Sequence, residues 1–143
     1  MYHKLKNIAD IFAQHLCSRE WDKAIALQAP WVSTKSEREF KERFSDMPCH
    51  PVSWSVSADP RWSPDVLSAH LAEGSIWPPF EPVHEDMTKK LFRGCAVIKL
   101  FPSEEDGAKY DISQCGELWV FAAYFKEKFS IGWWDFISDV DGA

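Results

Sequence analysis

Asp135 and Tyr124 are the two side chains of this sequence whose types and placement come closest to a catalytic pair. Both lie in an apolar stretch from Gly116 to Ile137, which alternation predicts to be a β-hairpin. If Asp135 faces inward beside apolar side chains, with Tyr124 on the partner strand, desolvation raises its pKa and makes it a candidate proton carrier. The other interpretation is a structural, solvated Asp near the end of the hairpin. We favour the structural interpretation, because no third group can be placed to orient the pair.

The remaining ionisable and nucleophilic residues form no recognisable catalytic motif. The sequence contains no Gly-x-Ser-x-Gly elbow, no phosphate-binding loop, no dinucleotide fingerprint and no His-Glu-x-x-His run. His84, Glu85 and Asp86 are consecutive, so they point in different directions and are best interpreted as a solvated turn. His15 and His70 lie on or beside apolar helix faces, where a hydrogen-bonded packing role is the simpler interpretation. We therefore expect binding rather than catalysis.

The four cysteines are widely spaced and give no metal or disulfide pattern. No two of them form a Cys-x-x-Cys pair, and no export signal is present, so we expect reduced structural thiols, with disulfides as the alternative. The adjacent Cys49 and His50 are candidate zinc ligands without a matching second pair. We expect no metal and no cofactor. The cysteines are Cys17, Cys49, Cys95 and Cys115.

The length and composition of the chain indicate one globular domain, covering residues 1–143. The chain has 143 residues, 45% hydrophobic and 27% charged, with eight Trp and ten Phe to fill a core. The net charge of −6, with scattered Lys and Arg, argues against nucleic-acid binding and against an anionic membrane surface. No run approaches the length of a membrane span, and no signal peptide is recognisable, so we expect a cytoplasmic protein.

The first strand of the hairpin is apolar on both of its faces. Such a strand lies inside a sheet that is covered on both sides, or it is covered on one side by a partner. Because three amphipathic helices cannot cover every apolar face, we expect a homodimer formed through the sheet. The two faces are Leu118, Val120, Ala122 and Tyr124 on one side, and Trp119, Phe121, Ala123 and Phe125 on the other.

The second strand of the hairpin has one richer apolar face. After the charged connection at 126–128, alternation places Phe129, Ile131 and Trp133 on one face, and it places Asp135 in the same row. The surplus of Trp fits core filling, a pocket or a protein interface. The candidate ligand-binding residues are Trp119, Phe121 and Trp133.

The first third of the chain is predicted to be helical. Apolar spacings of three and four predict an amphipathic helix over 2–17. Ser18 is the expected N-cap of a second helix, which ends before Pro30. A third helix ends before Pro48, and two alternative capping boxes precede it: Thr34 with Glu37, and Ser36 with Glu39.

The rest of the chain is predicted to form strands that flank a Pro-rich insert. A half-buried strand is predicted over 52–56, and residues 57–92 then contain five of the nine prolines. Within this insert we expect helices at 65–73 and 83–90. Beyond it we expect, in chain order, a strand at 95–101, a polar turn at 103–107, and a short edge piece at Tyr110 and Ile112.

This order of elements resembles the nuclear transport factor 2-like superfamily. The features that carry the resemblance are three helices with an Ala29-Pro30 break after the second, a strand, an irregular middle, and long strands ending in Trp-Trp-Asp-Phe at 133–136. The resemblance implies a cystatin-like α+β fold, in which N-terminal helices pack on a curved, mainly antiparallel sheet to form a cone-like barrel. We expect that fold class.

The resemblance also sets the functional alternatives. It implies a binding protein that holds a small apolar ligand in the cone or a protein partner on the sheet. Two alternatives stay open: an immunity-type inhibitor of a bacterial toxin, which would need an acidic, aromatic outer patch, and a small enzyme of ketosteroid isomerase or dehydratase type. The isomerase pattern of an inward Asp and Tyr matches Asp135 and Tyr124 only loosely.

Overall fold

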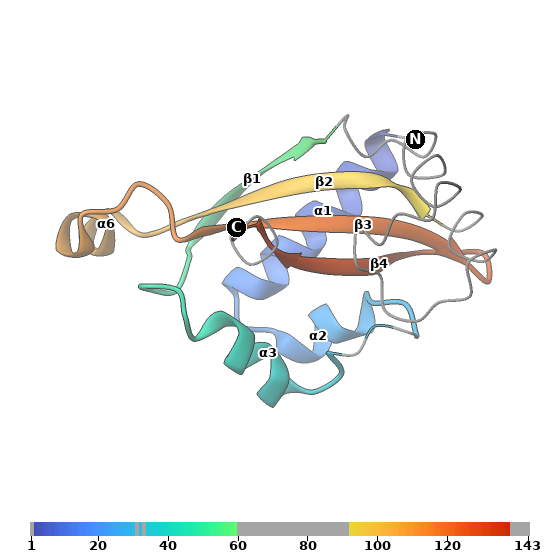
Figure 1. The fold of residues 1–143 in the computed structure, drawn as a ribbon, viewed down its shortest axis with the longest axis horizontal. Helices are drawn as coiled ribbons and strands as arrows, with labels where there is room; N and C mark the ends of the chain where they lie inside the picture. The colour runs from blue at the N-terminus through green and yellow to red at the C-terminus, as the bar shows by residue number, and fades with distance from the viewer. Residues whose placement is uncertain (1, 31, 33, 60–91, 138–143) are drawn as a thin grey trace.

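The computed structural model describes residues 2–30, 32, 34–59 and 92–137. This part of the chain is α+β, with four helices and one open, four-stranded antiparallel sheet in the order β1-β2-β3-β4 (Figure 1). The helices are α1 (Tyr2–Cys17), α2 (Trp21–Ala26), α3 (Glu37–Phe44) and α6 (Glu104–Tyr110). The strands are β1 (Ser53–Ala58), β2 (Phe92–Phe101), β3 (Gly116–Phe125) and β4 (Lys128–Phe136).

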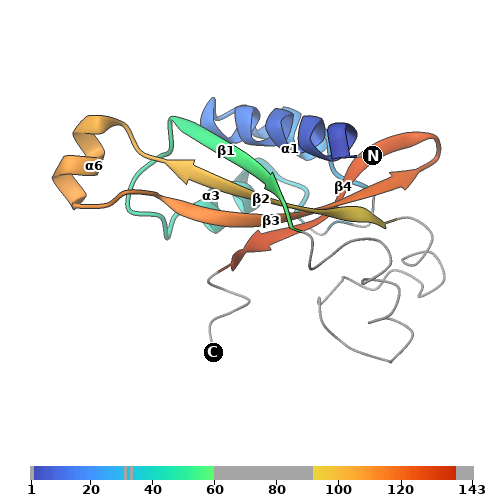
Figure 2. The same cartoon turned by 90° about the horizontal axis from the view of Figure 1, so that it is seen from above.

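Helix α1 lies across one face of the sheet (Figure 2). Its bounds are those that the apolar spacing predicts, because residues three and four apart share one face of a helix. That face is buried in the core shared with the strands: Leu5, Ile8, Phe12 and Leu16. The helix therefore fixes which face of the sheet is the inner one.

The two following helices are shorter than the sequence suggests. Glu20, and not Ser18, is the N-cap of α2, because the chain first turns through Arg19 at a φ of 57°. For α3, the structure selects the capping box formed by Ser36 and Glu39. The Glu39 N–H donates to Ser36 Oγ at 3.1 Å, and Ser36 Oγ donates to Glu39 Oε1 at 3.0 Å.

The hairpin of β3 and β4 is confirmed, but its register differs from simple alternation. Phe121 pairs with Trp133, whereas the next residue, Ala122, pairs with Ile131, so Gly132 is an extra residue in β4. The prediction that Ile131, Trp133 and Asp135 share one face is therefore wrong. Ile131 belongs to the core shared with the helices, whereas Trp133 and Asp135 stand opposite Phe121 and Trp119.

The connection between β2 and β3 is helical, which the sequence analysis missed. Residues 103–107 were expected to form a polar turn, and Tyr110 with Ile112 an edge strand. Instead, Ser103 caps α6, and Tyr110 is the last residue of that helix. The helices expected at 65–73 and 83–90, and most of the Pro-rich insert, lie outside the described residues.

Aromatic rings fill the layer between the helices and the sheet. Trp134 of β4 lies at the centre, with ring centroids of Phe12, Phe40 and Phe44 at 5.8, 5.2 and 5.7 Å. Its indole N–H donates to Gln28 Oε1 at 2.7 Å, so its polar atom is also satisfied. The resemblance implies a cone that could hold a ligand between the helices and the sheet. In this structure, core side chains fill the space between the helices and the sheet.

Candidate functional site

Asp135 forms a structural link between β4 and α3. Its Oδ1 accepts hydrogen bonds from Arg43 Nη2 and from the backbone N–H of Phe136, the latter at 2.8 Å. The Arg43 guanidinium also stacks on the ring of Trp134, 4.2 Å from the centroid. The two charged side chains are half-buried, 31% exposed for Arg43 and 24% for Asp135. Partners of this kind suit a carboxylate that holds two elements together.

Tyr124 lies far from Asp135, so the structure does not bring the candidate catalytic pair together. Tyr124 pairs with Phe129 next to the hairpin turn and is 40% exposed, whereas Asp135 pairs with Trp119 near the other end. Trp119, the partner of Asp135, lies five positions before Tyr124 in β3, roughly 17 Å at the rise of an antiparallel strand. The odd interval also places them on opposite faces of the sheet.

The three candidate ligand-binding aromatics do gather in one place. Phe121 and Trp133 stand opposite each other, with ring centroids 5.4 Å apart in an edge-to-face arrangement. Trp119 lies two positions before Phe121 in β3 and therefore on the same face, which is the face turned away from α1. All three are buried, at 2%, 0% and 7% exposed for Trp119, Phe121 and Trp133. They form a packed aromatic row.

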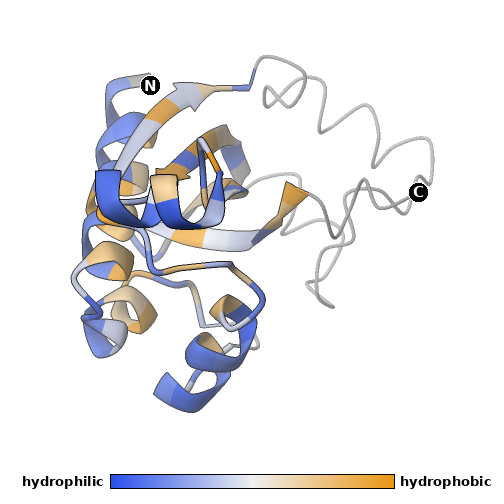
Figure 3. Cartoon of the chain, turned by 90° about the vertical axis from the view of Figure 1, so that its left-hand side faces the viewer, coloured by the Kyte–Doolittle hydropathy of each residue, from blue (hydrophilic) through white to orange (hydrophobic). Residues whose placement is uncertain are grey.

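Helix α6 stands apart from the rest of the described fold, at one end of the sheet (Figure 1). None of its residues is buried, and its surface is mostly hydrophilic (Figure 3). Ser103 Oγ accepts from the Asp106 N–H at 3.1 Å at one end, and Asp111 closes the other end in the left-handed conformation. We call the acidic residues of α6 and its C-cap, together with the exposed tyrosine, the acidic projection: Glu104, Glu105, Asp106, Tyr110 and Asp111.

The acidic projection combines charge with an exposed aromatic ring. Four carboxylates against Lys109 give residues 103–111 a net charge of −3. Tyr110 is 44% exposed, and Lys109 Nζ lies 5.2 Å from the centroid of its ring. The signal in the sequence was the Ser103-x-x-Asp106 spacing, which has the form of a helix N-terminus.

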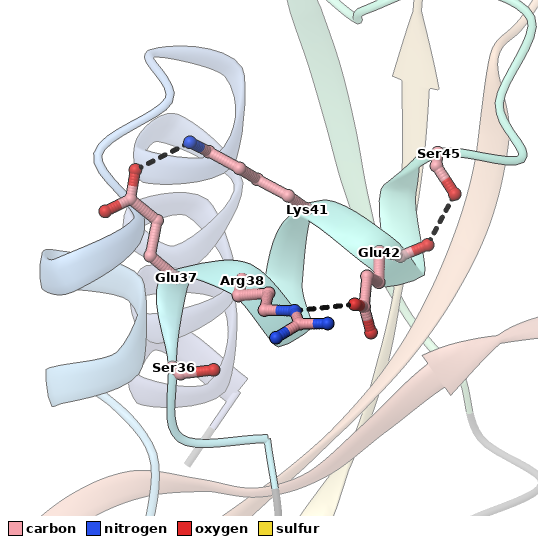
Figure 4. A pocket seen from close by; sticks show the side chains of 6 residues that line it. All are labelled: Ser36, Glu37, Arg38, Lys41, Glu42 and Ser45. Atoms are coloured by element: carbon pink, nitrogen blue, oxygen red, sulfur yellow. Dashed lines mark hydrogen bonds and ion pairs between the residues drawn. The ribbon is translucent and has the colours of Figure 1, made fainter.

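The outer face of α3 carries a shallow depression of about 700 Å³ whose charges are already paired (Figure 4). Lys41 Nζ lies 3.0 Å from Glu37 Oε1, and Arg38 Nε lies 3.1 Å from Glu42 Oε1. Ser45 Oγ donates to the Glu42 carbonyl at 2.6 Å. Pairs spaced four residues apart are typical of a solvated helix surface, so the charges in this depression are better explained by the stability of α3 than by a ligand.

The cysteines and histidines of the described residues form no metal site. All four cysteines are free, and no group of three metal-ligating side chains occurs among the described residues. His15 Nδ1 lies 3.1 Å from Glu20 Oε1, in keeping with the packing role expected for it. His50 Nε2 donates to the Cys17 carbonyl at 2.8 Å. His70 and residues 84–86 lie outside the described residues.

Comparisons with protein families, with characterised proteins and with solved structures give no match for this chain. Among the helices of the described residues, none is both long and apolar enough to cross a membrane.

Proposed function

We propose that this protein is a binding protein that engages a protein partner with a basic surface through the acidic projection. The observation that carries the proposal is a helix without a single buried residue, which together with its C-cap Asp111 holds four carboxylates and an exposed tyrosine away from the sheet. A surface of this composition favours cationic partners, because summed charge steers association and aromatic side chains supply much of the contact energy.

The helix contributes little to the core, which supports a role in binding. A seven-residue helix is too short to be stable alone, and α6 has no buried face that packing could stabilise. The two ends of the helix are stabilised by the N-cap Ser103 and by Asp111, which has the left-handed conformation. The acidic side chains of Glu104, Glu105 and Asp106 also stabilise α6. They occupy its first turn, where the helix dipole is favourable to anions.

Catalysis is the weaker proposal because the best candidate proton carrier, Asp135, already accepts hydrogen bonds from other residues of the fold. Asp135 is bound by Arg43 and by the Phe136 N–H, and Tyr124 lies on the other face. A proton carrier of the isomerase type needs both groups at one substrate atom. An enzyme of ketosteroid isomerase or dehydratase type is therefore not what we propose.

We further propose that the chain is of nuclear transport factor 2-like type, as its order of elements suggests. Three helices in the first third, followed by the four strands of an antiparallel sheet, support this proposal. Within that superfamily, the acidic projection agrees best with an immunity-type inhibitor, whose target would be a basic toxin.

A small apolar ligand is the second candidate for what this protein binds. The aromatic row of Trp119, Phe121 and Trp133 favours this candidate. These rings lie on the sheet face away from α1, and those of Phe121 and Trp133 are in contact. The homodimer expected from the sequence stays a prediction. Since these rings are buried within a single chain, a second copy would more readily use the outer edge of β1.

The partner can be identified by comparing two charge-reversal variants. One carries Glu104→Lys and Glu105→Lys on α6, and the matched control carries Glu37→Lys and Glu42→Lys on the exposed face of α3. Each tagged variant is used for affinity capture in the native cells, followed by binding measurements with the purified partner. We expect a basic partner that the wild type and the α3 control retain and the α6 variant loses. An α6 variant that keeps every partner would overturn the proposal.

A further inference from the structure

Two cysteines far apart in the sequence lie side by side in the fold. Cys49 Sγ and Cys115 Sγ are 3.5 Å apart, although the residues are 66 positions apart. Cys49 belongs to the connection between α3 and β1, and Cys115 directly precedes β3. A disulfide requires about 2.05 Å between the sulfur atoms, so the gap to be closed is about 1.5 Å.

Both cysteines are held in place by their neighbours. The Cys115 N–H donates to the Leu100 carbonyl at 2.7 Å, which fixes it to the end of β2. Next to Cys49, the His50 ring donates to the Cys17 carbonyl at 2.8 Å and packs edge-on against Trp21, 6.3 Å between centroids. The short distance between the sulfur atoms is therefore built by two anchored segments.

We propose that Cys49 and Cys115 form a redox-modification site, which a small disulfide of the glutathione type converts into an intramolecular disulfide. In the first step, the Cys49 thiolate attacks one sulfur of the small disulfide, forms a mixed disulfide and expels one thiolate. In the second step, the Cys115 thiolate attacks Cys49 Sγ and expels the other. The protein loses two electrons and two protons, and the small disulfide gains them as two thiols.

The two thiols have different accessibilities, which sets their order of reaction. Cys49 is half-exposed, whereas Cys115 is buried. Burial and the hydrogen bond with Cys49 raise the pKa of Cys115 to about 12, and burial raises that of Cys17 to about 11. Because Cys49 is the more accessible thiol, it meets the small disulfide first, and the attack by the buried Cys115 limits the rate. The rate of closure should therefore rise with pH as the buried Cys115 thiol loses its proton.

The disulfide would close a long loop and so stabilise the fold. Cross-linking residues 66 apart removes chain entropy from the unfolded state. The chain-entropy relation predicts a rise of about a thousandfold in the ratio of folded to unfolded protein. The bond would also tie the segment after α3 to the segment that follows α6.

The test is oxidation of the full-length protein by oxidised glutathione between pH 7 and 9. Free thiols are then alkylated and the products mapped by mass spectrometry. We expect the wild type to lose two thiols and two mass units, with a peptide joining Cys49 to Cys115. Cys49→Ser and Cys115→Ser should block the bond. Cys95→Ser, a buried thiol elsewhere in the sheet, should leave it unchanged.

A Cys17→Ser variant distinguishes the proposed bond from a disulfide that involves Cys17. Cys17 is the alternative to consider because it contributes electrostatically to the raised pKa of Cys115. Formation of the Cys49–Cys115 bond in Cys17→Ser supports the proposal. A bond that disappears in Cys17→Ser but persists in Cys49→Ser would overturn it. So would four thiols left free after prolonged oxidation at pH 9, or an oxidised protein whose resistance to urea does not exceed that of the reduced form.

Discussion

Replacing Asp135 by Asn should weaken the fold slightly and should do so only when Arg43 is present. Two unit charges about 4 Å apart attract by roughly 4 kcal/mol at an effective dielectric constant near 20. Ordering the two side chains and removing their water cancels most of this, and exposed pairs retain about 0.2 to 1 kcal/mol. Since these side chains are 31% and 24% exposed, we expect a coupling at the upper end, about 1 kcal/mol.

The assay is a double-mutant cycle measured by urea unfolding of wild type, Asp135→Asn, Arg43→Met and the double variant. Arg43→Met alone should cost more than Asp135→Asn, because it also removes the guanidinium from the Trp134 ring. The cycle isolates the pair from that stacking contact. A coupling below about 0.2 kcal/mol, the lower limit for an exposed pair, would refute the structural role assigned to Asp135.

The remaining predictions concern the core and the response to acid. Phe40→Ala removes a fully buried ring that contacts Phe12 and Trp134, so it should cost about 3 to 5 kcal/mol in urea unfolding, and a loss below 1 kcal/mol would contradict this packing. Hydrogen bonds from Lys23 and His15 lower the pKa of Glu20 from 4.5. The folded state therefore gains stability from ionised Glu20 above that value and loses it as the pH falls through the lowered pKa. Glu20→Gln should flatten the stability profile below pH 4.5, and an unchanged profile would show that these contacts do not persist in solution.

Local patterns in the sequence were sufficient for several elements of the fold. The apolar spacing predicted the bounds of α1, because a helix buries residues three and four apart. Uninterrupted alternation predicted the hairpin of β3 and β4. The charged connection at Lys126 and Glu127 is a two-residue turn in which both residues have positive φ, 51° and 62°.

Features that depend on tertiary structure were not accessible from the sequence. The extra residue at Gly132 changes which side chains face the core, and alternation continues through it without a break. Arg43 and Asp135 are 92 positions apart, so nothing local joins them. The segment that forms α6 was interpreted as a turn because its composition is polar and includes Gly107, although Ser103 and Asp106 have the spacing of a helix cap.

The most direct test of the binding role is the affinity of the captured partner for two α6 variants. The first is Tyr110→Ala and the second combines Glu104→Lys with Glu105→Lys, both at positions that bury nothing in the fold. Calorimetry at low and at physiological salt gives the affinities. We predict wild-type stability for both variants, an affinity at least tenfold weaker for the charge reversal, and weaker wild-type binding at the higher salt concentration. Wild-type affinity in both variants would show that the partner binds elsewhere and would contradict the role assigned to the acidic projection.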